Sequence, residues 1–185
     1  MRTRIAVAAL CAALAACSQT GPRYQASIDN VQELQRSKPA KIGVGTVKLD
    51  EPKAESLNRL SVRGTSVLSP YGGYAEYLKE ALQADLTTAG MYDPQARTVV
   101  NAVLTENDLD GTGASIGEAK VRARFTVTNG ATVRYDKEHA ATHQWESSFI
   151  GGIAIPRAIQ NYAAAVQKLL GSLFADPAFK AAVRD

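Results

Sequence analysis

The clearest pattern of hydrophobic and polar positions in this chain is a strict alternation over residues 119–128. Hydrophobic side chains occupy one parity and polar side chains the other: Ala119, Val121, Ala123, Phe125 and Val127 against Lys120, Arg122, Arg124, Thr126 and Thr128. Alternation at period two predicts a strand with one buried and one solvent-exposed face. Asn129-Gly130, a favoured two-residue turn, follows, and residues 132–146 resume the alternation. We therefore predict an antiparallel hairpin.

Three other segments have the composition of strands. Residues 42–49 and 98–105 are rich in β-branched side chains, and residues 60–64 fit a short additional strand. The acidic run Glu106 to Asp110 and the glycines after it are expected to form a loop at the end of the strand. Residues 51–55, which include Pro52, are expected to form a loop as well.

Helical periodicity predicts two long helices and two short ones. The first long helix is expected to start at Ser69-Pro70 and end at Gly90, with Asp85 as a polar residue on its apolar stripe. The second is expected after a loop at Gly151-Gly152, with Ile153 to Pro156 leading into it and a stripe that ends at Leu173. Short helices are predicted near residues 27–35 and 177–183, capped by Ser27 and Asp176.

This order of elements predicts an α+β fold. We expect a two-layer sandwich in which an antiparallel or mixed sheet of four to five strands carries two long helices on one face. Helices on one face leave the other face of the sheet open to solvent.

The N-terminus has the features of a secretory signal. Arg2 and Arg4 precede an apolar run of about a dozen residues that ends in Leu14-Ala15-Ala16-Cys17. That run is too short to span a membrane, which takes about 20 apolar residues. The chain is therefore expected to be exported.

Leu14-Ala15-Ala16-Cys17 also resembles the lipobox of bacterial lipoproteins. The resemblance implies cleavage before Cys17, a diacylglyceryl group on its sulfur and an acylated (for example palmitoylated) N-terminus. Ser18 follows, where an Asp commonly retains such lipoproteins at the inner membrane, so the resemblance implies the periplasmic face of the outer membrane. The alternative is an ordinary secretory signal with a chance cysteine at its cleavage site.

Cleavage before Cys17 would change the composition of the working protein. It removes residues 1–16 and leaves 169 residues, with 19 Lys and Arg against 18 Asp and Glu. A nearly neutral chain lacks the excess of positive charge that is typical of nucleic-acid-binding proteins. Cys11 leaves with the signal and Cys17 is acylated, so no thiol remains for a disulfide, a nucleophile or a metal site. Residues 17–40 are expected to form the anchor, a tether and a short helix, and residues 41–185 a single domain.

From the first strand onward, the chain resembles small envelope lipoproteins of the YajG type. The matching segments are Tyr77-Leu78-Lys79-Glu80-Ala81-Leu82, Ala89-Gly90, the hairpin at Asn129-Gly130, Phe149-Ile150-Gly151-Gly152 and Leu173-Phe174-Ala175-Asp176-Pro177-Ala178-Phe179. At coarser grain it is similar to the two-layer sandwich of LptE, PelC and LpoB, accessory lipoproteins of envelope machines. The resemblance implies a fold and a compartment and no catalytic residue.

Catalytic and metal-binding groups are sparse. His139 and His143 share a parity on the predicted strand, which separates them by about 13 Å, too far for one metal ion. The run Glu106, Asp108, Asp110 lacks the ligand spacing and closing Glu of a calcium loop. No Gly-x-Ser-x-Gly motif is present. We therefore expect no metal, no cofactor and no enzyme activity.

The exposed parity of the central strand carries three cations, Lys120, Arg122 and Arg124, and Arg134 is expected nearby on the return strand. They fit an acidic partner such as lipopolysaccharide phosphates, peptidoglycan carboxylates or an acidic protein. Cross-strand ion pairs with Asp136, Glu138 and Glu146 are the simpler alternative, and we favour it.

The segment 147–155 offers a second surface, because apolar residues flank Gly151-Gly152. These residues fit either insertion into a partner or membrane, or packing on the core, which we favour. Taken together, the sequence predicts a lipid-anchored, non-catalytic binding or assembly accessory of the cell envelope. A small-lipid or glycolipid carrier and a cell-wall hydrolase remain as alternatives.

Overall fold

The alternating segment lies in the middle of a four-stranded sheet. The computed structural model describes residues 18–38, 40–113 and 115–184. Strand β6 (Ile116–Asn129) pairs antiparallel with β5 (Thr98–Asp110) on one side and β7 (Thr132–Glu146) on the other. Strand β2 (Ile42–Leu49) pairs parallel with β5, which gives the order β2-β5-β6-β7. The sheet is therefore mixed.

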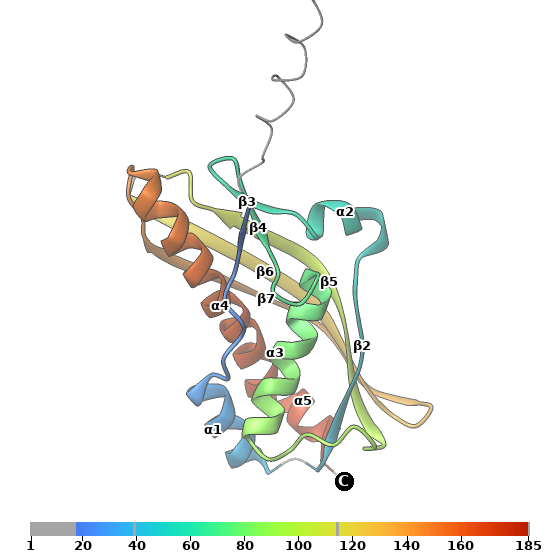
Figure 1. Ribbon diagram of the computed structural model, residues 1–185. Coiled ribbons are helices and arrows are strands. Elements are labelled where there is room, and N and C mark those ends of the chain that lie inside the picture. The colour runs from blue at the N-terminus through green and yellow to red at the C-terminus, as the bar shows by residue number, and fades with distance from the viewer. Residues whose placement is uncertain (1–17, 39, 114, 185) are drawn as a thin grey trace, which may run out of the picture.

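Two long helices cover one face of this sheet (Figure 1). Helix α3 (Tyr74–Thr88) packs on β2, and α4 (Gly151–Ala175) packs on β6 and β7. The five hydrophobic residues of the predicted inward parity of β6 are all buried beneath them: Ala119, Val121, Ala123, Phe125 and Val127. The predicted α+β two-layer sandwich with two long helices on one face is confirmed.

The two predicted short helices are present. Helix α1 (Ile28–Ser37) is capped by Ser27, whose hydroxyl accepts from the Asn30 N–H, and α5 (Pro177–Ala182) is capped by Asp176. Both helices lie at the end of the molecule where the described chain finishes, far from Ser18 (Figure 1). The chain therefore starts at one end of the sandwich and finishes at the other.

A second, smaller sheet was not expected. Its order is β1-β4-β3, formed by β1 (Ser18–Thr20), β4 (Thr65–Leu68) and β3 (Leu60–Val62). Only β3 was predicted. The two-residue turn Arg63-Gly64 joins β3 to β4, and both residues have positive φ, 50° and 80°. Residues 51–55, predicted as a loop, instead form a 3₁₀ turn η1 (Glu51–Lys53) and the start of helix α2 (Ala54–Leu57), so that prediction is wrong.

Both long helices begin elsewhere than predicted. Helix α3 starts at Tyr74 because Gly72 has φ +88°, which a helix cannot contain, and the Ser69 hydroxyl instead accepts from the Tyr71 N–H in a turn. Helix α4 starts at Gly151, and Pro156 lies inside it. The proline cannot donate to the Gly152 carbonyl, but Gly152 is exposed in the first turn, where this carbonyl is accessible to solvent.

The acidic run 106–110 is part of β5, so its prediction as a loop is wrong. A bulge between Leu104 and Glu106 shifts the parity of the strand. Asn107 and Leu109 therefore point inward, while Glu106, Asp108 and Asp110 point to the solvent side. Asn107 is buried but satisfied: it donates to the Leu57 carbonyl and accepts from the Tyr162 hydroxyl, each over 2.8 Å.

The predicted hairpin is confirmed, with its turn one residue later than expected. Asn129 pairs with Thr132, so the turn residues are Gly130 and Ala131, and Gly130 supplies the positive φ of 58°. A bulge after Val127 leaves Arg134 outside the ladder. In the described part of the chain, no helix combines the length and hydrophobicity needed to cross a bilayer.

Candidate functional site

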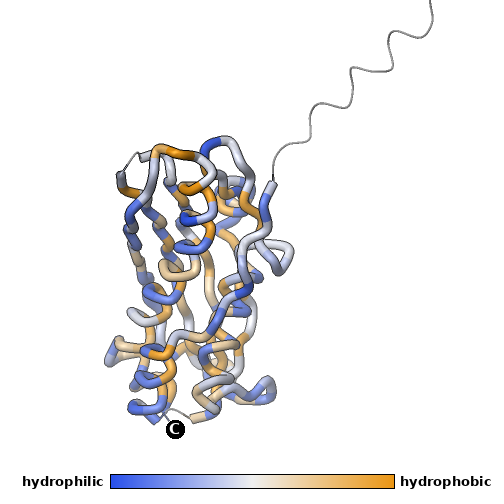
Figure 2. The backbone as a smooth tube through the Cα atoms, turned by 60° about the vertical axis from the view of Figure 1, so that its left-hand side comes forward, coloured by the Kyte–Doolittle hydropathy of each residue, from blue (hydrophilic) through white to orange (hydrophobic). Residues whose placement is uncertain are grey.

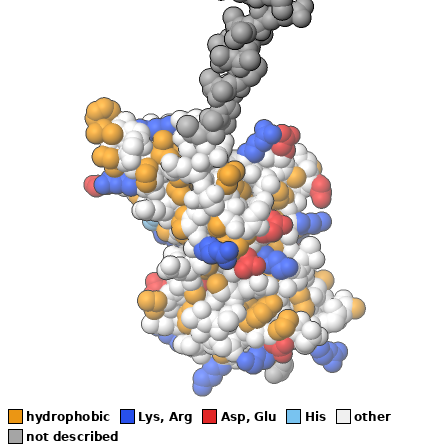
Figure 3. Space-filling model, viewed as in Figure 1, with side chains coloured by type: hydrophobic (Ala, Val, Ile, Leu, Met, Phe, Trp, Pro, Cys, Tyr) orange, Lys and Arg blue, Asp and Glu red, His pale blue; other side chains and the backbone are white. Residues whose placement is uncertain are grey.

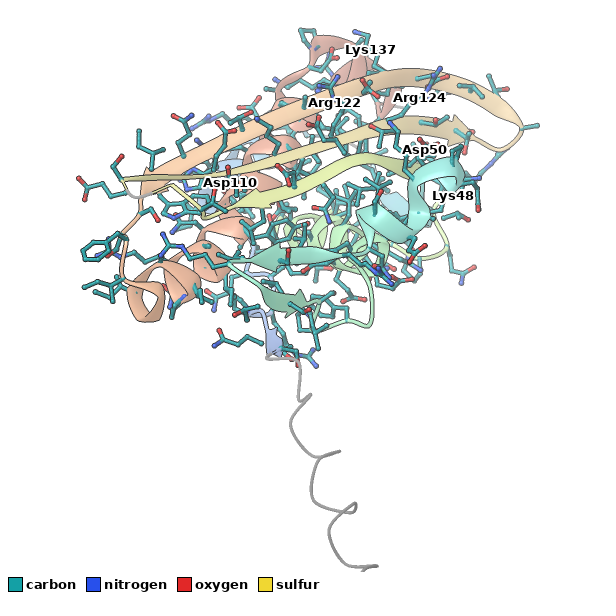
Figure 4. All side chains as sticks on the ribbon, turned by 90° about the horizontal axis from the view of Figure 1, so that it is seen from above. Lys48, Asp50, Asp110, Arg122, Arg124 and Lys137 are labelled. Carbon is teal, nitrogen blue, oxygen red and sulfur yellow. The ribbon has the colours of Figure 1, made fainter. Side chains whose placement is uncertain are left out.

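The charged strip, defined as Lys120, Arg122 and Arg124 of β6, lies on the sheet face opposite the helices. Figure 4 shows Arg122 and Arg124 pointing away from the helical layer. The Arg124 guanidinium donates from Nε and Nη2 to the two carboxylate oxygens of Asp136 on β7, over 2.6 and 2.7 Å. This two-pronged ion pair lowers the pKa of Asp136.

The other two cations of the strip also meet carboxylates. Arg122 donates to Glu106 on β5 over 3.0 Å and to Glu138 on β7 over 3.3 Å. Lys120 forms an ion pair with Glu118 over 2.6 Å, which lowers the pKa of that carboxyl. Each cation of the charged strip therefore has a carboxylate neighbour. The pairings to Asp136 and Glu138 are those of the simpler alternative, whereas Glu146 takes no part in these bonds.

Arg134 does not join the charged strip. Its bulged position turns the guanidinium toward the C-terminal end, where Nη1 donates to the Arg184 carbonyl over 3.1 Å. The structure thus brings together three of the four predicted cations. Beside them lies an open groove of about 580 Å³, which Lys53, Arg59, Glu106, Asp108, Arg122 and Glu138 help to line. Its charges are mixed, so it offers no uniform field to an ionic ligand.

His139 belongs to a partly buried polar cluster between β7 and the junction of α4 and α5. Its Nε2 lies 2.5 Å from the Tyr135 hydroxyl, which donates to Asp176 over 2.9 Å, and its Nδ1 lies 3.0 Å from the Ser172 hydroxyl. Desolvation lowers the pKa of His139, against the opposing effect of Asp176. The Ser172 hydroxyl also lies 2.7 Å from the Leu169 carbonyl of its own helix, a second acceptor within its reach.

His143 points to the same side of β7 and pairs through Nε2 with the Asn161 side-chain oxygen over 2.9 Å. Among residues 18–38, 40–113 and 115–184, no three His, Cys, Asp or Glu side chains are grouped so as to hold a metal ion. Of the acidic run, Glu106 pairs with Arg122, and Asp110 accepts from the Thr112 amide and hydroxyl.

The predicted anchor residue, Cys17, lies outside the described residues. Ser18 follows it directly and already belongs to β1, where it pairs with Ser66. The polar segment after the cysteine, expected as a tether, therefore begins in a sheet. From there the chain runs along the length of the molecule to α1 as a mostly hydrophilic segment (Figure 2).

A buried carboxylate fastens this N-terminal segment to α3. Asp85 is 0% exposed and accepts hydrogen bonds from the Tyr24 hydroxyl, the Ser27 amide and the Asn30 side chain. Asn30 donates also to the Gln167 carbonyl of α4. Burial raises the pKa of Asp85, while these three donors act in the opposite direction. The segment that follows the predicted anchor is thus bonded to both long helices.

The apolar tip, defined as Ile116, Phe149, Ile150 and Ile153, is the second exposed surface. Ile116 starts β6, Phe149 and Ile150 directly precede α4, and Ile153 lies in its first turn; their exposed fractions are 57, 77, 50 and 42%. The prediction that the residues flanking Gly151-Gly152 pack on the core is therefore wrong for three of them. Ala154, in the first turn of α4, is 0% exposed, so this turn packs one face on the core and presents Ile150 and Ile153 to the solvent.

Arg63 ties the loop before α4 to the small sheet. Its guanidinium donates to four backbone carbonyls, those of Gly111, Gly113, Ser148 and Phe149, over 2.6–3.2 Å. A non-glycine residue at φ 50° is uncommon, and such backbone marks places that tertiary contacts over-determine. Sequence reasoning missed Arg63, because Arg-Gly is not one of the dipeptides that signal a two-residue hairpin turn.

The comparisons with known proteins add a likeness in fold. No family model and no curated protein matches the chain. The fold is similar to that of a DUF330 protein from Xanthomonas campestris, with a TM-score of 0.57, 12% identity, and coverage of 89% of this chain and 96% of that one. At 12% identity this likeness is evidence for the fold alone.

Two further solved structures are similar more weakly. They are a provisionally assigned lipoprotein from Caulobacter crescentus CB15 (TM-score 0.36, 14% identity, 79% of this chain and 96% of that one) and the PelC dodecamer from Paraburkholderia phytofirmans (0.33, 17%, 85% and 96%). Nothing about this chain follows from scores that low. The YajG-type resemblance stays a prediction.

Proposed function

We propose that the protein is a lipid-anchored lipoprotein of the outer membrane, facing the periplasm, that serves as a non-catalytic binding or assembly accessory of the envelope. The observation that supports this most is the position of Cys17, one residue before β1. Acylation there would place the sandwich directly at the membrane, because residues 18–20 are paired in a sheet and Tyr24, Ser27 and Asn30 are bonded to Asp85.

Two features favour a binding role over catalysis or lipid transport. Ser172 and His139 lie in a partly buried contact between β7 and α4, and the Ser172 hydroxyl is 2.7 Å from the Leu169 carbonyl of its own helix, an arrangement typical of a structural hydrogen bond. The apolar cleft lined by residues that include Val67, Tyr74, Ile159 and Tyr162 has a volume of about 10 Å³, room for one water molecule but not for an acyl chain.

The charged strip is the candidate surface for an acidic partner. An acidic protein, a peptidoglycan carboxylate or a lipopolysaccharide phosphate would have to displace Glu106, Glu138 and Asp136 from Arg122 and Arg124. Crosslinking in intact cells, with the two arginines changed together to Glu, tests this role. Unchanged recovery of the crosslinked partner would show that the charged strip does not bind it.

Substitution of the predicted anchor tests the proposed function. Cys17→Ser is expected to abolish labelling by radioactive palmitate and release the protein from outer-membrane fractions. Cys11→Ser is the matched control and is expected to leave both unchanged, since Cys11 lies within the predicted signal. Labelled, membrane-bound protein in the Cys17→Ser variant would contradict the proposal.

A further inference from the structure

The apolar tip lies at the end of the molecule where the described chain begins. Figure 3 shows hydrophobic side chains gathered on a projection at that end, and Figure 1 places the start of α4 there. The members of the tip are between 42 and 77% exposed. Monomeric proteins rarely leave adjacent large hydrophobic side chains open to water unless another surface covers them.

A short chain of contacts joins the apolar tip to Ser18. Ser18 pairs with Ser66 of β4, and the turn before β4 is Arg63-Gly64. The guanidinium of Arg63 in turn donates to the Phe149 carbonyl over 2.8 Å and to the Ser148 carbonyl over 2.6 Å. The residue after Cys17 and the tip are thus fixed to the same turn, which defines an anchor end of the molecule.

The charges around the tip suit a lipid surface. Residues 147–155 contain no Asp, Glu, Lys or Arg. Arg63 and Arg157 border this segment and bond backbone carbonyls, Arg157 through that of Glu146. The Glu146 side chain is the carboxylate beside this segment, at the end of β7. Apolar side chains bordered by cations are the pattern of segments that lie at the interface of phospholipid bilayers.

We propose that the apolar tip inserts into the lipid leaflet that carries the acyl chains of Cys17. This inference rests on the proposed function, because the anchor sets which surface faces the membrane. Insertion of Phe149, Ile150 and Ile153 to a depth of about 5–10 Å adds a second contact to the anchor and fixes the orientation of the sandwich. The charged strip and its groove then stand out from the membrane on the side of the sheet, open to a periplasmic partner.

Depth measurements on the intact lipidated protein test this proposal. After processing and acylation the chain has no free thiol, so Phe149→Cys and Ile153→Cys each accept a single nitroxide label. The labelled proteins are reconstituted in vesicles of phosphatidylethanolamine and phosphatidylglycerol. We expect the ratio of oxygen accessibility to nickel-chelate accessibility at both sites to exceed, several-fold, the ratio at an exposed site far from the anchor end.

Val133→Cys provides that matched control site, because Val133 is 58% exposed but lies at the hairpin turn on the opposite end. A ratio at residue 149 equal to that at residue 133 overturns the proposal. Spin–spin coupling between labels at residue 149, with low oxygen accessibility, also overturns it and identifies a second copy of the chain as the occupant. Flotation of the vesicles and the mass of the N-terminal peptide report acylation separately, so failure of the anchor is distinguishable from failure of insertion.

Discussion

The charged strip and the apolar tip are both exposed, but their side chains are satisfied in different ways. Arg122 and Arg124 find carboxylates on the two neighbouring strands, at distances of 2.6–3.3 Å. Phe149, Ile150 and Ile153 cannot be stabilised by a neighbouring side chain in this way. Only removal from water lowers the free energy of an apolar surface, and these side chains are 42–77% exposed. A run of cations is therefore a weaker sign of a partner than exposed hydrophobic residues at a defined end.

The two surfaces also use arginine differently. Arg124 bonds a side chain across an exposed face, whereas Arg63 bonds four carbonyls of two loops and sets the position of the tip. Hydrogen bonds from a charged donor to partly buried carbonyls are harder to replace by water than an exposed ion pair. A lone arginine in a tight turn thus organises more structure than the arginines of the alternating strand.

The largest effect on stability is expected at Asp85, which fastens the segment leading from the anchor end. Asp85→Ala leaves the Tyr24 hydroxyl, the Ser27 amide and the Asn30 amide group without their acceptor in a buried site. We expect a loss of about 3 kcal/mol in the free energy of unfolding, measured by urea denaturation. Asp108→Ala, at an exposed position of β5, is the control and should change little. Equal effects would show that the buried bonds are not what holds the segment.

A smaller loss is expected when the tip is released from its turn. Arg63→Ala removes four hydrogen bonds to carbonyls, of which water can replace some, and should cost about 1–3 kcal/mol. A label at residue 149 should become more mobile in the same variant. Arg59→Ala is the control, since Arg59 makes only an exposed ion pair with Glu55. An immobile label in the Arg63→Ala variant would contradict the role given to this turn.

The histidine cluster predicts a pH dependence of its own. Desolvation lowers the pKa of His139 below its usual 6.5, even though Asp176 faces the ring, with Lys137, Tyr135 and Ser172 also around it. The unfolded chain then binds the proton more readily, so stability is lost as the pH falls from 7 toward 5. Thermal unfolding of His139→Gln should show a flatter dependence over this range; a slope as steep as that of the parent protein would exclude His139 as the cause.

The apolar tip itself should contribute almost nothing to stability. The change Phe149→Ser removes a side chain that is 77% exposed, so the free energy of unfolding should stay within about 0.5 kcal/mol of that of the parent protein. Urea denaturation checks this. A clear destabilisation would mean that the tip packs on the sandwich and is not available to a membrane.

The smallest effect is expected on the charged strip. Arg124→Ala, Asp136→Ala and the double variant form a cycle for the two-pronged ion pair, which is exposed and screened by salt. Melting temperatures of the three variants should coincide with that of the parent protein within experimental error. A coupling energy between Arg124 and Asp136 that persists in high salt would contradict this expectation and show that the ion pair stabilises the fold.

The alternation in residues 119–128 and the helical stripes predicted most of the architecture. A strand or helix that buries one face carries hydrophobic residues with a period of 2 or 3.6 residues, which can be recognised in the sequence. Short elements and element ends were less predictable. The positive φ at Gly72 and the bulge after Leu104 moved the start of α3 and the inward parity of β5, and both depend on what packs nearby.

The sequence by itself was enough to predict the sandwich and its hairpin. It also contains Cys17, on which the proposed location at the outer membrane depends. The tertiary structure decided which exposed charged side chains have a hydrogen-bond or ion-pair partner. It paired the two arginines of β6 with carboxylates from two other strands, turned Arg134 toward the C-terminal end, and joined Arg63 to a loop 85 residues away. Contacts over such separations in the chain follow from strand order and bulges, which no local pattern specifies. The β3–β4 hairpin, which pairs with Ser18 and carries Arg63, links the tip to the end of the molecule where the described chain begins.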